Sequence, residues 1–560
     1  MIALVTSSTT SAPVEILKAA LPIGIGLASA AYLTIKAASY NSVIGETIPT
    51  VAVRKGDSTH DAEYFSDPDA FLKKCEAEYG PVFNLYIMNQ HMTTVSGPMV
   101  REVFMTESFS FSDAIDDQTG LKAFTSSVVK SNKDDDGRVA HEIIRDNISP
   151  NLPLFTPRIV RQLQKTVDEE LGQCDGKLFE TPLNVFQDMI AGAMANVFMG
   201  PEIAQDRRVI DTFIYCTYDF AKVLGKNPNK RSFWHTLNNR TRYGYLNPLQ
   251  KHIQVLVDVS TPVILERRRQ EQEAAERGVT WERPLDIMQK LLDNFDKYHF
   301  VDIEDICGHL LLLVLASVHT TTDTSTNLCY YLAAFPQYIE DLYQEQQEVL
   351  DQITQERQAQ RQKMLNDGDV ASEKDFIGTD LDPSCDRDLT AAAVKRMLKM
   401  DSFVREVFRY RGERLGLPHQ ARQNVELSNG MVIRKGSKVI VNMHSVHQSG
   451  SLQGEDPTEF RPWRFVGKSK AATKASSDFL AFGMGSLTPL VLSPLAISAF
   501  CRHACPGRFL AIQELKTVGV LMVSNYSKIE IQDPSKTKKA LLSRIGDPID
   551  TGLIFTSRVK

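Results

Sequence analysis

A single cysteine near the C-terminus carries the clearest chemistry in this sequence. In the stretch "RHACPGRFLA", Cys505 lies two residues before Gly507, and a helix is predicted to begin at Arg508. A helix N-terminus lowers the pKa of a thiol and favours the thiolate. Gly485 and Gly507 allow the backbone to approach a flat ligand closely. The pattern suits a cysteine that gives one thiolate to a metal, and the alternative is an inert buried thiol.

A polar run interrupts the longest apolar helix that the sequence predicts, over residues 301–335. The run reads "ASVHTTTD" and contains His319, Thr320 and Thr321. Hydroxyls in the middle of a helix commonly donate to a carbonyl one turn back and have no further role. Three threonines and a histidine in such a helix also suggest a local break that faces a pocket. Both interpretations stay open on the residues alone.

A third group of residues is typical of a structural network. Glu406 and Arg409 are three positions apart in "DSFVREVFRY", so they lie on one helix face and can pair. Alone, such a pair is commonly a surface ion pair of little energy. Arg464 lies in the aromatic, proline-containing loop "DPTEFRPWRF", where a partly buried arginine needs a partner. Glu406 is therefore expected to bridge Arg409 and Arg464 and to hold this loop in shape.

Long helices dominate the predicted elements that position these residues. Apolar residues recur every three or four positions, and the longest helix is predicted to end before Pro336. Alternation around two turns predicts a small β-sheet at 424–444, and the acidic stretch 366–388 predicts an exposed loop. The expected fold class is mainly α with small β-sheets. The predicted helices cover residues 155–175, 184–200, 251–277, 284–296, 301–335 and 337–364.

The composition is that of a large globular protein. The chain has 560 residues, of which 42% are hydrophobic and 24% charged, and this length can bury a large core. The net charge of −6 gives no basis for nucleic-acid binding. The eight cysteines show no paired spacing, which indicates a reducing compartment. No linker rich in Pro, Gly or Ser divides the sequence, so we expect one large domain.

An uncharged N-terminal run predicts a membrane anchor. Residues 19–35 carry no charge and are long enough to span a bilayer at the lower limit. A signal peptide is the alternative, but no basic residues precede the apolar run. Basic residues follow the run instead, which places the bulk of the chain in the cytosol. The predicted organisation is a tail (1–18), a transmembrane anchor (19–36), a linker (37–60) and one domain (61–560).

Taken in order, these motifs resemble the cytochrome P450 superfamily of haem-thiolate monooxygenases, in particular its microsomal and fungal members. "AxxHTT" is similar to the oxygen-binding motif of the long central helix, and Glu406-x-x-Arg409 to the ExxR motif. "FRPWRF" resembles the arginine loop that follows, and "RHACPGRFLA" the cysteine loop. The resemblance covers roughly residues 60–555. It implies a cytochrome P450 fold behind an N-terminal transmembrane helix.

The resemblance also implies the cofactor and the residues around it. Cys505 would be the axial ligand of the iron in haem b, because the family binds iron through a cysteine thiolate. The remaining residues of the cysteine-loop pattern are Phe482, Gly485 and Gly507. The residues expected to meet the haem propionates are His503 and either His141 or Arg145, although the tryptophan usual in that helix is absent. Glu406, Arg409 and Arg464 would support the loop.

The polar run of the central helix takes the catalytic role in this resemblance. Thr320 would help to deliver protons to the reaction, and Thr321 would do so if the register is shifted by one residue. His319 stands where many members have an acid, and Ser317 stands where many have glycine. Both departures put the details of proton delivery in doubt.

The cysteine loop departs from the family pattern by sixteen extra residues, 486–501, which read "SLTPLVLSPLAISAFC". A surface loop and an adaptation to a partner or membrane are two interpretations, but exposed loops are rich in Gly, Asn, Asp and Ser. A retained intron is the interpretation we favour. Phe500-Cys501-Arg502 can be encoded by a pyrimidine run that ends in AG, like a splice acceptor. Excision would leave "FGMGRHACPG" or "FGMGSHACPG", and either restores the family pattern.

The expected function is insertion of one oxygen atom from O2 into a steroid, terpenoid or fatty acid. The resemblance implies electrons from NADPH through NADPH-cytochrome P450 reductase, with cytochrome b5 as a further donor, and a location in the endoplasmic reticulum membrane. Two alternatives are a haem-thiolate isomerase or dehydratase that needs no reductase, and a degenerate relative disabled by the insertion.

Overall fold

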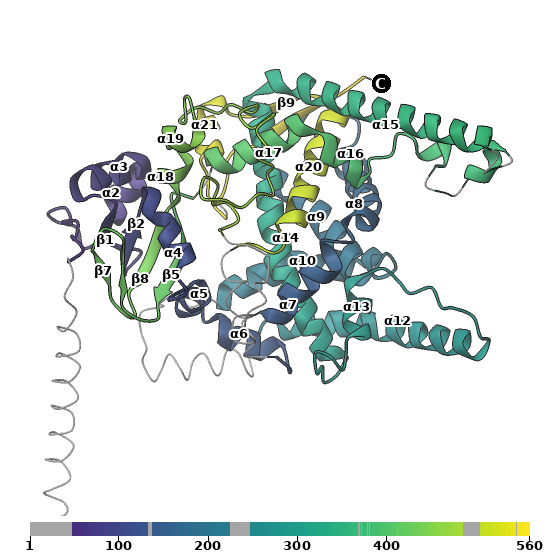
Figure 1. The fold of residues 1–560 in the computed structure, drawn as a ribbon, viewed down its shortest axis with the longest axis horizontal. Helices are drawn as coiled ribbons and strands as arrows, with labels where there is room; N and C mark the ends of the chain where they lie inside the picture. The colour runs from purple at the N-terminus through teal and green to yellow at the C-terminus, as the bar shows by residue number, and fades with distance from the viewer. Residues whose placement is uncertain are drawn as a thin grey trace, which may run out of the picture.

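The structure is a computed structural model of the chain, and Figure 1 shows its fold. It describes residues 47–559, apart from 133–136, 224–246, 485–503 and the short gaps at 368–369, 371, 378, 380, 412 and 545. The predicted tail, the anchor and the first part of the linker lie outside the described residues. The same holds for Gly485, His503 and the extra residues 486–501.

A long central helix, α14 (Ile303–Ala334), forms the middle of the helical part. Its N-terminus is capped by Asp302, whose side chain accepts a hydrogen bond from the Asp305 N–H, and it ends before Pro336. Within the described residues, α14 alone is long and apolar enough to cross a membrane, and most of this stretch is buried inside the protein. It is therefore a core helix, as an apolar helix with neighbours on most sides should be.

Four helices surround α14 directly. They are α9 (Pro182–Met199), α10 (Arg207–Val223), α12 (Gln250–Glu276) and α20 (Arg508–Asn525). All six helices predicted from apolar spacing are present. The remaining predicted ones are α8 (Leu152–Thr166), α13 (Ile287–Asp293) and α15 (Ile339–Asp367). The other helices are α2 (Asp61–Ser66), α3 (Pro68–Tyr79), α4 (Val100–Met105), α5 (Phe111–Thr119), α6 (Leu121–Val128), α7 (Arg138–Ile143), α16 (Ala391–Arg396), α17 (Leu398–Arg411), α18 (Met443–His447), α19 (Gly450–Gln453) and α21 (Thr537–Leu541).

Three small sheets complete the described part of the fold, and the largest joins segments far apart in the sequence. Its five strands run in the order β1 (Val82–Ile87), β2 (Gln90–Val95), β8 (Lys438–Asn442), β5 (Leu415–Ala421) and β3 (Phe109–Ser110). β2 and β8 pair in parallel, so the strand predicted within 424–444 joins an N-terminal hairpin. The other sheets consist of β4 (Asp175–Phe179), β10 (Leu553–Ser557) and β9 (Tyr526–Ile531), and of β6 (Val425–Glu426) and β7 (Val432–Ile433).

The end of the predicted linker belongs to the folded domain. Thr50 forms a β-bridge with Asn84 of β1, and the Val51 N–H donates to the Asn84 carbonyl at 3.0 Å. His60 is buried, and its ring bonds the carbonyls of Tyr86 and Val51. The last part of the predicted linker therefore packs on the first strand.

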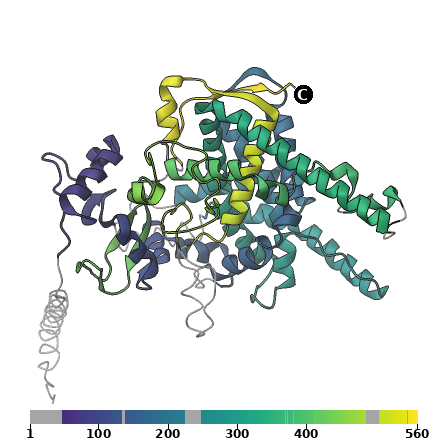
Figure 2. The same ribbon diagram turned by 45° about the horizontal axis from the view of Figure 1, so that its top comes forward.

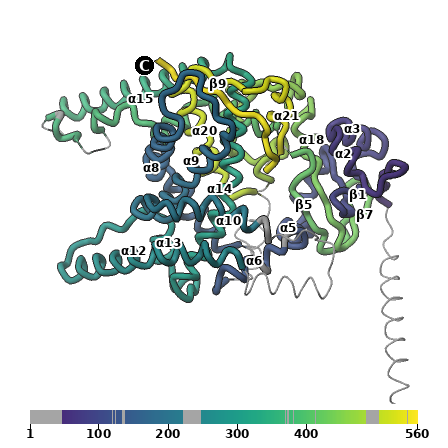
Figure 3. Tube along the Cα trace, turned by 180° about the vertical axis from the view of Figure 1, so that it is seen from behind, coloured from purple at the N-terminus to yellow at the C-terminus, as the bar shows by residue number. Residues whose placement is uncertain are grey.

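The acidic stretch 366–388 is also more ordered than the predicted exposed loop. Figure 1 shows α12 and α15 extending from the body on the side away from the β1–β2 hairpin, and Figures 2 and 3 agree. The stretch closes the outer end of α15. Arg361 pairs with Asp386 at 2.6 Å, and Phe376 is buried. One buried ion pair and one buried ring therefore hold the stretch against the helix.

Candidate functional site

The two halves of the cysteine loop meet in space. Gly483 and Ala504 form an isolated antiparallel β-bridge, and the Cys505 N–H donates to the Phe482 carbonyl at 2.8 Å. Gly483 has a φ of +73°, which glycine adopts readily. The side chain of Phe482 packs against Phe408 of α17, with the ring centroids 5.1 Å apart. Residues on both sides of the insertion therefore form one loop in front of α20.

Cys505 combines an exposed side chain with crowded surroundings. The residue is exposed, yet burial among protein atoms is the largest influence on its pKa and raises it. The backbone N–H of Gly507 and then the guanidinium and N–H of Arg508 lower the pKa. The thiol is therefore accessible although many protein atoms lie around it. Backbone N–H groups at the start of α20 stabilise the thiolate there.

The central helix exposes a short face although most of it is buried. Ala316 and Thr320 are exposed, and one helical turn separates them. The Thr320 hydroxyl donates to the Ala316 carbonyl at 3.1 Å, and the Ser317 hydroxyl donates to the Leu313 carbonyl at 2.8 Å. α14 runs without interruption, so the structure supports the first of the two open interpretations, in which the hydroxyls bond back within the helix.

The three candidate residues of the polar run differ in their surroundings. Thr320 is exposed, whereas Thr321 is buried in the core. His319 is half-buried, and its ring lies edge-on to the Tyr218 ring of α10, with centroids 6.3 Å apart. On the other side, a Cβ at Gly546 would lie 3.9 Å from His319 Nε2, so the turn at Gly546 adjoins the ring. The geometry favours Thr320 over Thr321 as the hydroxyl that faces a ligand.

Glu406, Arg409 and Arg464 form one buried network. Arg409 donates to both carboxylate oxygens of Glu406 at 2.7 Å, and Arg464 Nε donates to the same carboxylate at 3.1 and 3.3 Å. The Arg461 N–H adds a further bond to Glu406 at 2.8 Å. The two guanidinium groups also donate to backbone carbonyls of His447, Gln453, Glu455, Asp456, Pro457 and Glu459.

Two arginines that sequence reasoning missed extend this network toward the cysteine. Arg405 is fully buried between the rings of Phe465 and Phe479, at 4.7 and 3.9 Å from their centroids. Burial lowers the pKa of Arg405 to about 10. Arg508 donates to the Thr473 carbonyl at 3.0 Å and to the Cys505 carbonyl at 2.9 Å. Arg405 directly precedes Glu406 in the sequence REVFR. A second arginine next to the Glu406–Arg409 pair was the signal that could have indicated its part in the network.

His141 is near enough to both Arg145 and Arg508 for their charges to act on its pKa. His141 belongs to α7, and Arg145 to the π-helical segment Ile144–Ile148 that continues it. Burial lowers the pKa of His141, and Arg145 and Arg508 lower it further by charge repulsion. Arg145 also pairs with Asp146 at 2.6 Å. Two guanidinium groups, those of Arg145 and Arg508, therefore lie near a neutral imidazole.

These observations fit the haem that the resemblance implies. An accessible thiol with backbone N–H donors suits the single thiolate ligand of haem iron. Arg145 and His141 suit the carboxylate groups of haem. Ala316 and Thr320 are the exposed residues of α14, so a ligand on this face would meet the Thr320 hydroxyl. His503 and Gly485 lie outside the described residues.

Comparison with known proteins agrees with this geometry. The profile of the family "Cytochrome P450" matches residues 60–365 and 384–549. Cytochrome P450 monooxygenase paxP of Penicillium paxilli is 24% identical over 74% of this chain and 71% of its own length. Cytochrome P450 monooxygenase 151 of Postia placenta is 23% identical over 84% and 85%. The structure of retinoic acid-bound cyanobacterial CYP120A1 superposes with a TM-score of 0.58 and 17% identity, over 92% of this chain and all of that one.

Proposed function

The chain belongs to the cytochrome P450 family of haem-thiolate monooxygenases, and we propose that it inserts one oxygen atom from O2 into a lipophilic steroid, terpenoid or fatty acid. The family, the expected fold and the oxidoreductase class are confirmed. The observation that carries the proposal is the position of Cys505. Its thiol is accessible, receives backbone N–H donors from the start of α20, and follows a loop closed by the Gly483–Ala504 bridge.

The residues around the proposed haem site would have separate roles. Haem, when bound, supplies the iron that activates O2. Cys505 would hold that iron, and Gly507 and Arg508 would stabilise its thiolate through their N–H groups. Arg145 and His141 would bind the haem carboxylates, together with His503. The Thr320 hydroxyl would hold or pass a proton on the exposed face of α14, and His319 would position this face against α10.

The electron supply and the location are proposed by analogy with the microsomal members of the family. We infer that electrons come from NADPH through NADPH-cytochrome P450 reductase, with cytochrome b5 as a further donor. The uncharged run 19–35, followed by basic residues, supports an endoplasmic reticulum anchor with a cytosolic domain. The substrate class rests on the apolar sequence around the exposed face, where Leu312 and Leu315 accompany Ala316.

Two measurements test the proposal. The purified full chain with reductase should show the carbon monoxide difference band of a thiolate-bound haem and should consume one NADPH and one O2 per hydroxylated product. Cys505→Ser should abolish the thiolate band. A thiolate band with product formed in the absence of NADPH would support the isomerase or dehydratase alternative and contradict the monooxygenase.

A second candidate is a degenerate relative that no longer holds haem. Twenty residues separate Gly483 from Ala504 in this chain. Without residues 486–501 four would remain, which is a common length for a hairpin connection. The insertion therefore lengthens the one connection that brings the halves of the cysteine loop together. Absence of haem from the purified chain would favour this candidate.

A further inference from the structure

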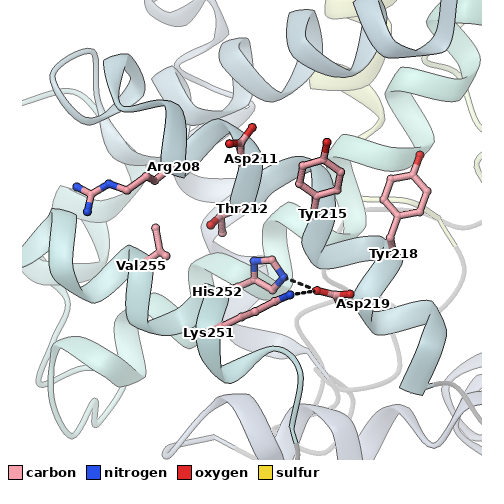
Figure 4. A pocket seen from close by; sticks show the side chains of 9 residues that line it. All are labelled: Arg208, Asp211, Thr212, Tyr215, Tyr218, Asp219, Lys251, His252 and Val255. Carbon is pink, nitrogen blue, oxygen red and sulfur yellow. Dashed lines mark hydrogen bonds and ion pairs between the residues drawn. The ribbon is translucent and has the colours of Figure 1, made fainter. Parts of the chain in front are cut away.

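A pocket lies between α10 and α12, apart from the cysteine loop. It has a volume of about 440 Å³ and includes neither Cys505 nor the exposed residues of α14. Figure 4 shows Thr212, Tyr215, Tyr218 and Asp219 entering it from α10, and Lys251 and His252 from α12. Nothing in the proposed reaction uses this pocket.

A buried pair of polar side chains forms one wall of the pocket. His252 and Asp219 are both more than nine-tenths buried, and His252 Nε2 lies 3.0 Å from Asp219 Oδ2. The Lys251 ammonium pairs with the same carboxylate oxygen at 2.6 Å. A buried polar pair needs a reason, because an apolar pair of similar size would avoid the desolvation of these groups.

The protonation of His252 follows from its partners. Burial lowers the pKa of His252, and the nearby Lys251 ammonium lowers it too, while the hydrogen bond to Asp219 acts in the opposite direction. The ring is therefore neutral near pH 7. A carboxylate paired with an ammonium accepts hydrogen bonds, so His252 Nε2 carries the proton and Nδ1 is an acceptor. Figure 4 shows this second nitrogen turned toward Thr212 and the pocket.

The charges around the pocket are already paired. Arg208 donates to Asp206 at 2.6 Å, and Lys251 to Asp219. Asp211 accepts from Arg207 at 2.8 Å. An anionic or cationic ligand would have to break one of these pairs. Thr212 contributes a buried hydroxyl, and Tyr215 and Tyr218 contribute exposed aromatic surface.

We propose that the pocket between α10 and α12 binds a neutral lipophilic alcohol. The ligand hydroxyl donates to His252 Nδ1 and accepts from the Thr212 hydroxyl, and its apolar body lies on Tyr215 and Tyr218. An alcohol satisfies both groups, whereas an ether or a hydrocarbon leaves the histidine acceptor without a donor. The site stands apart from the proposed function because it requires no haem. Tyr218 also contacts His319, so the pocket adjoins the face of α14 that carries Thr320.

Equilibrium dialysis of the full chain with radiolabelled farnesol tests this site. Farnesol should bind about 3- to 10-fold more tightly than its methyl ether, which cannot donate a hydrogen bond. Thr212→Val, which keeps the side-chain volume, and His252→Gln should each weaken farnesol binding by about the same factor. Gln254→Ala is the control, because Gln254 is an exposed residue of α12 outside the pocket and should leave binding unchanged.

The outcomes separate this site from the reaction site. Equal affinity for farnesol and its methyl ether would overturn the proposal, as would binding that neither Thr212→Val nor His252→Gln alters. The haem spectrum of each variant is recorded in parallel. A failure of the proposed monooxygenase appears in that spectrum and leaves the dialysis result standing.

Discussion

The region around the cysteine loop and the region between α10 and α12 are built in opposite ways. Near the cysteine loop, Glu406 accepts hydrogen bonds from three residues. Two of them, Arg409 and Arg464, also donate to backbone carbonyls. Between α10 and α12, Tyr215 and Tyr218 remain exposed, and the charged groups pair mostly at the surface. The network around Glu406 therefore holds the backbone of its loops in place, whereas the region between α10 and α12 exposes side chains that a ligand could contact.

The difference follows from what each region must hold. An iron ligand has to stay in one position, so the segment that carries it is tied by buried, multiply bonded charges. A wall that faces lipophilic ligands needs apolar surface and a few directed polar groups. The first arrangement is destroyed by a single lost partner, whereas the second should change its preference without losing the fold.

Removal of residues 486–501 should have the largest effect. The haem content per chain should be at least about tenfold higher in the shortened chain than in the chain with the insertion, because four residues then join Gly483 and Ala504. Haem content and the carbon monoxide difference spectrum measure this. Removal of 487–502 instead should restore haem equally, since it also leaves a four-residue connection. Equal haem in the shortened and full chains would show that the loop tolerates the insertion.

Loss of Glu406 should be the largest effect of a single substitution on stability. Glu406→Ala leaves Arg409 and Arg464 buried without their carboxylate, and we expect the free energy of unfolding to fall by about 3–5 kcal/mol. Chemical denaturation measures the change. The matched control is Glu356→Ala, which breaks an exposed pair with Arg396 and should have little effect. Similar losses for both variants would mean that burial does not distinguish the two ion pairs.

Local sequence patterns predicted the first region better than the second. The Glu406–Arg409 spacing fixes a helix-face pair, and the helices follow from apolar periodicity over many residues. Pairing of β2 with β8 joins segments about 340 residues apart, and no local pattern records such a partner. The pair of Asp219 and His252 was missed for the same reason, because its members come from different helices. The sequence also left open whether α14 is regular or broken at its threonines, because threonine hydroxyls are compatible with both.

Glu514 of α20 should lower stability rather than raise it. Its side chain is fully buried, neither carboxyl oxygen has a hydrogen-bond partner among the described residues, and burial raises its pKa well above the ordinary value. Glu514→Met should therefore increase the free energy of unfolding by about 1–3 kcal/mol near neutral pH. Thermal or chemical unfolding of both forms measures this.

The pH dependence of Glu514 has a definite sign. The folded pKa lies above the unfolded one, so the stabilisation of the wild type is fully present below pH 4 to 5 and is lost as pH rises toward the folded pKa. The advantage of Glu514→Met should thus grow with pH. The control is Glu345→Met: Glu345 is also buried but accepts the Lys399 and Met400 N–H groups, so its loss should destabilise. If the stability gained by Glu514→Met becomes smaller as pH rises, the raised pKa of Glu514 is contradicted.

The smallest effect on stability, and the most specific effect on the reaction, is expected at Thr320. Because this side chain is exposed and its hydroxyl bonds only within its own helix, Thr320→Val should change the free energy of unfolding by no more than about 0.5 kcal/mol. It should nevertheless raise the NADPH oxidised per product formed, since the hydroxyl that faces the ligand is gone. Thr321→Val alters a hydroxyl buried in the core and should leave that ratio unchanged. If Thr321→Val raises the ratio and Thr320→Val does not, the proton-handling hydroxyl lies one residue further along α14 than the exposed face indicates.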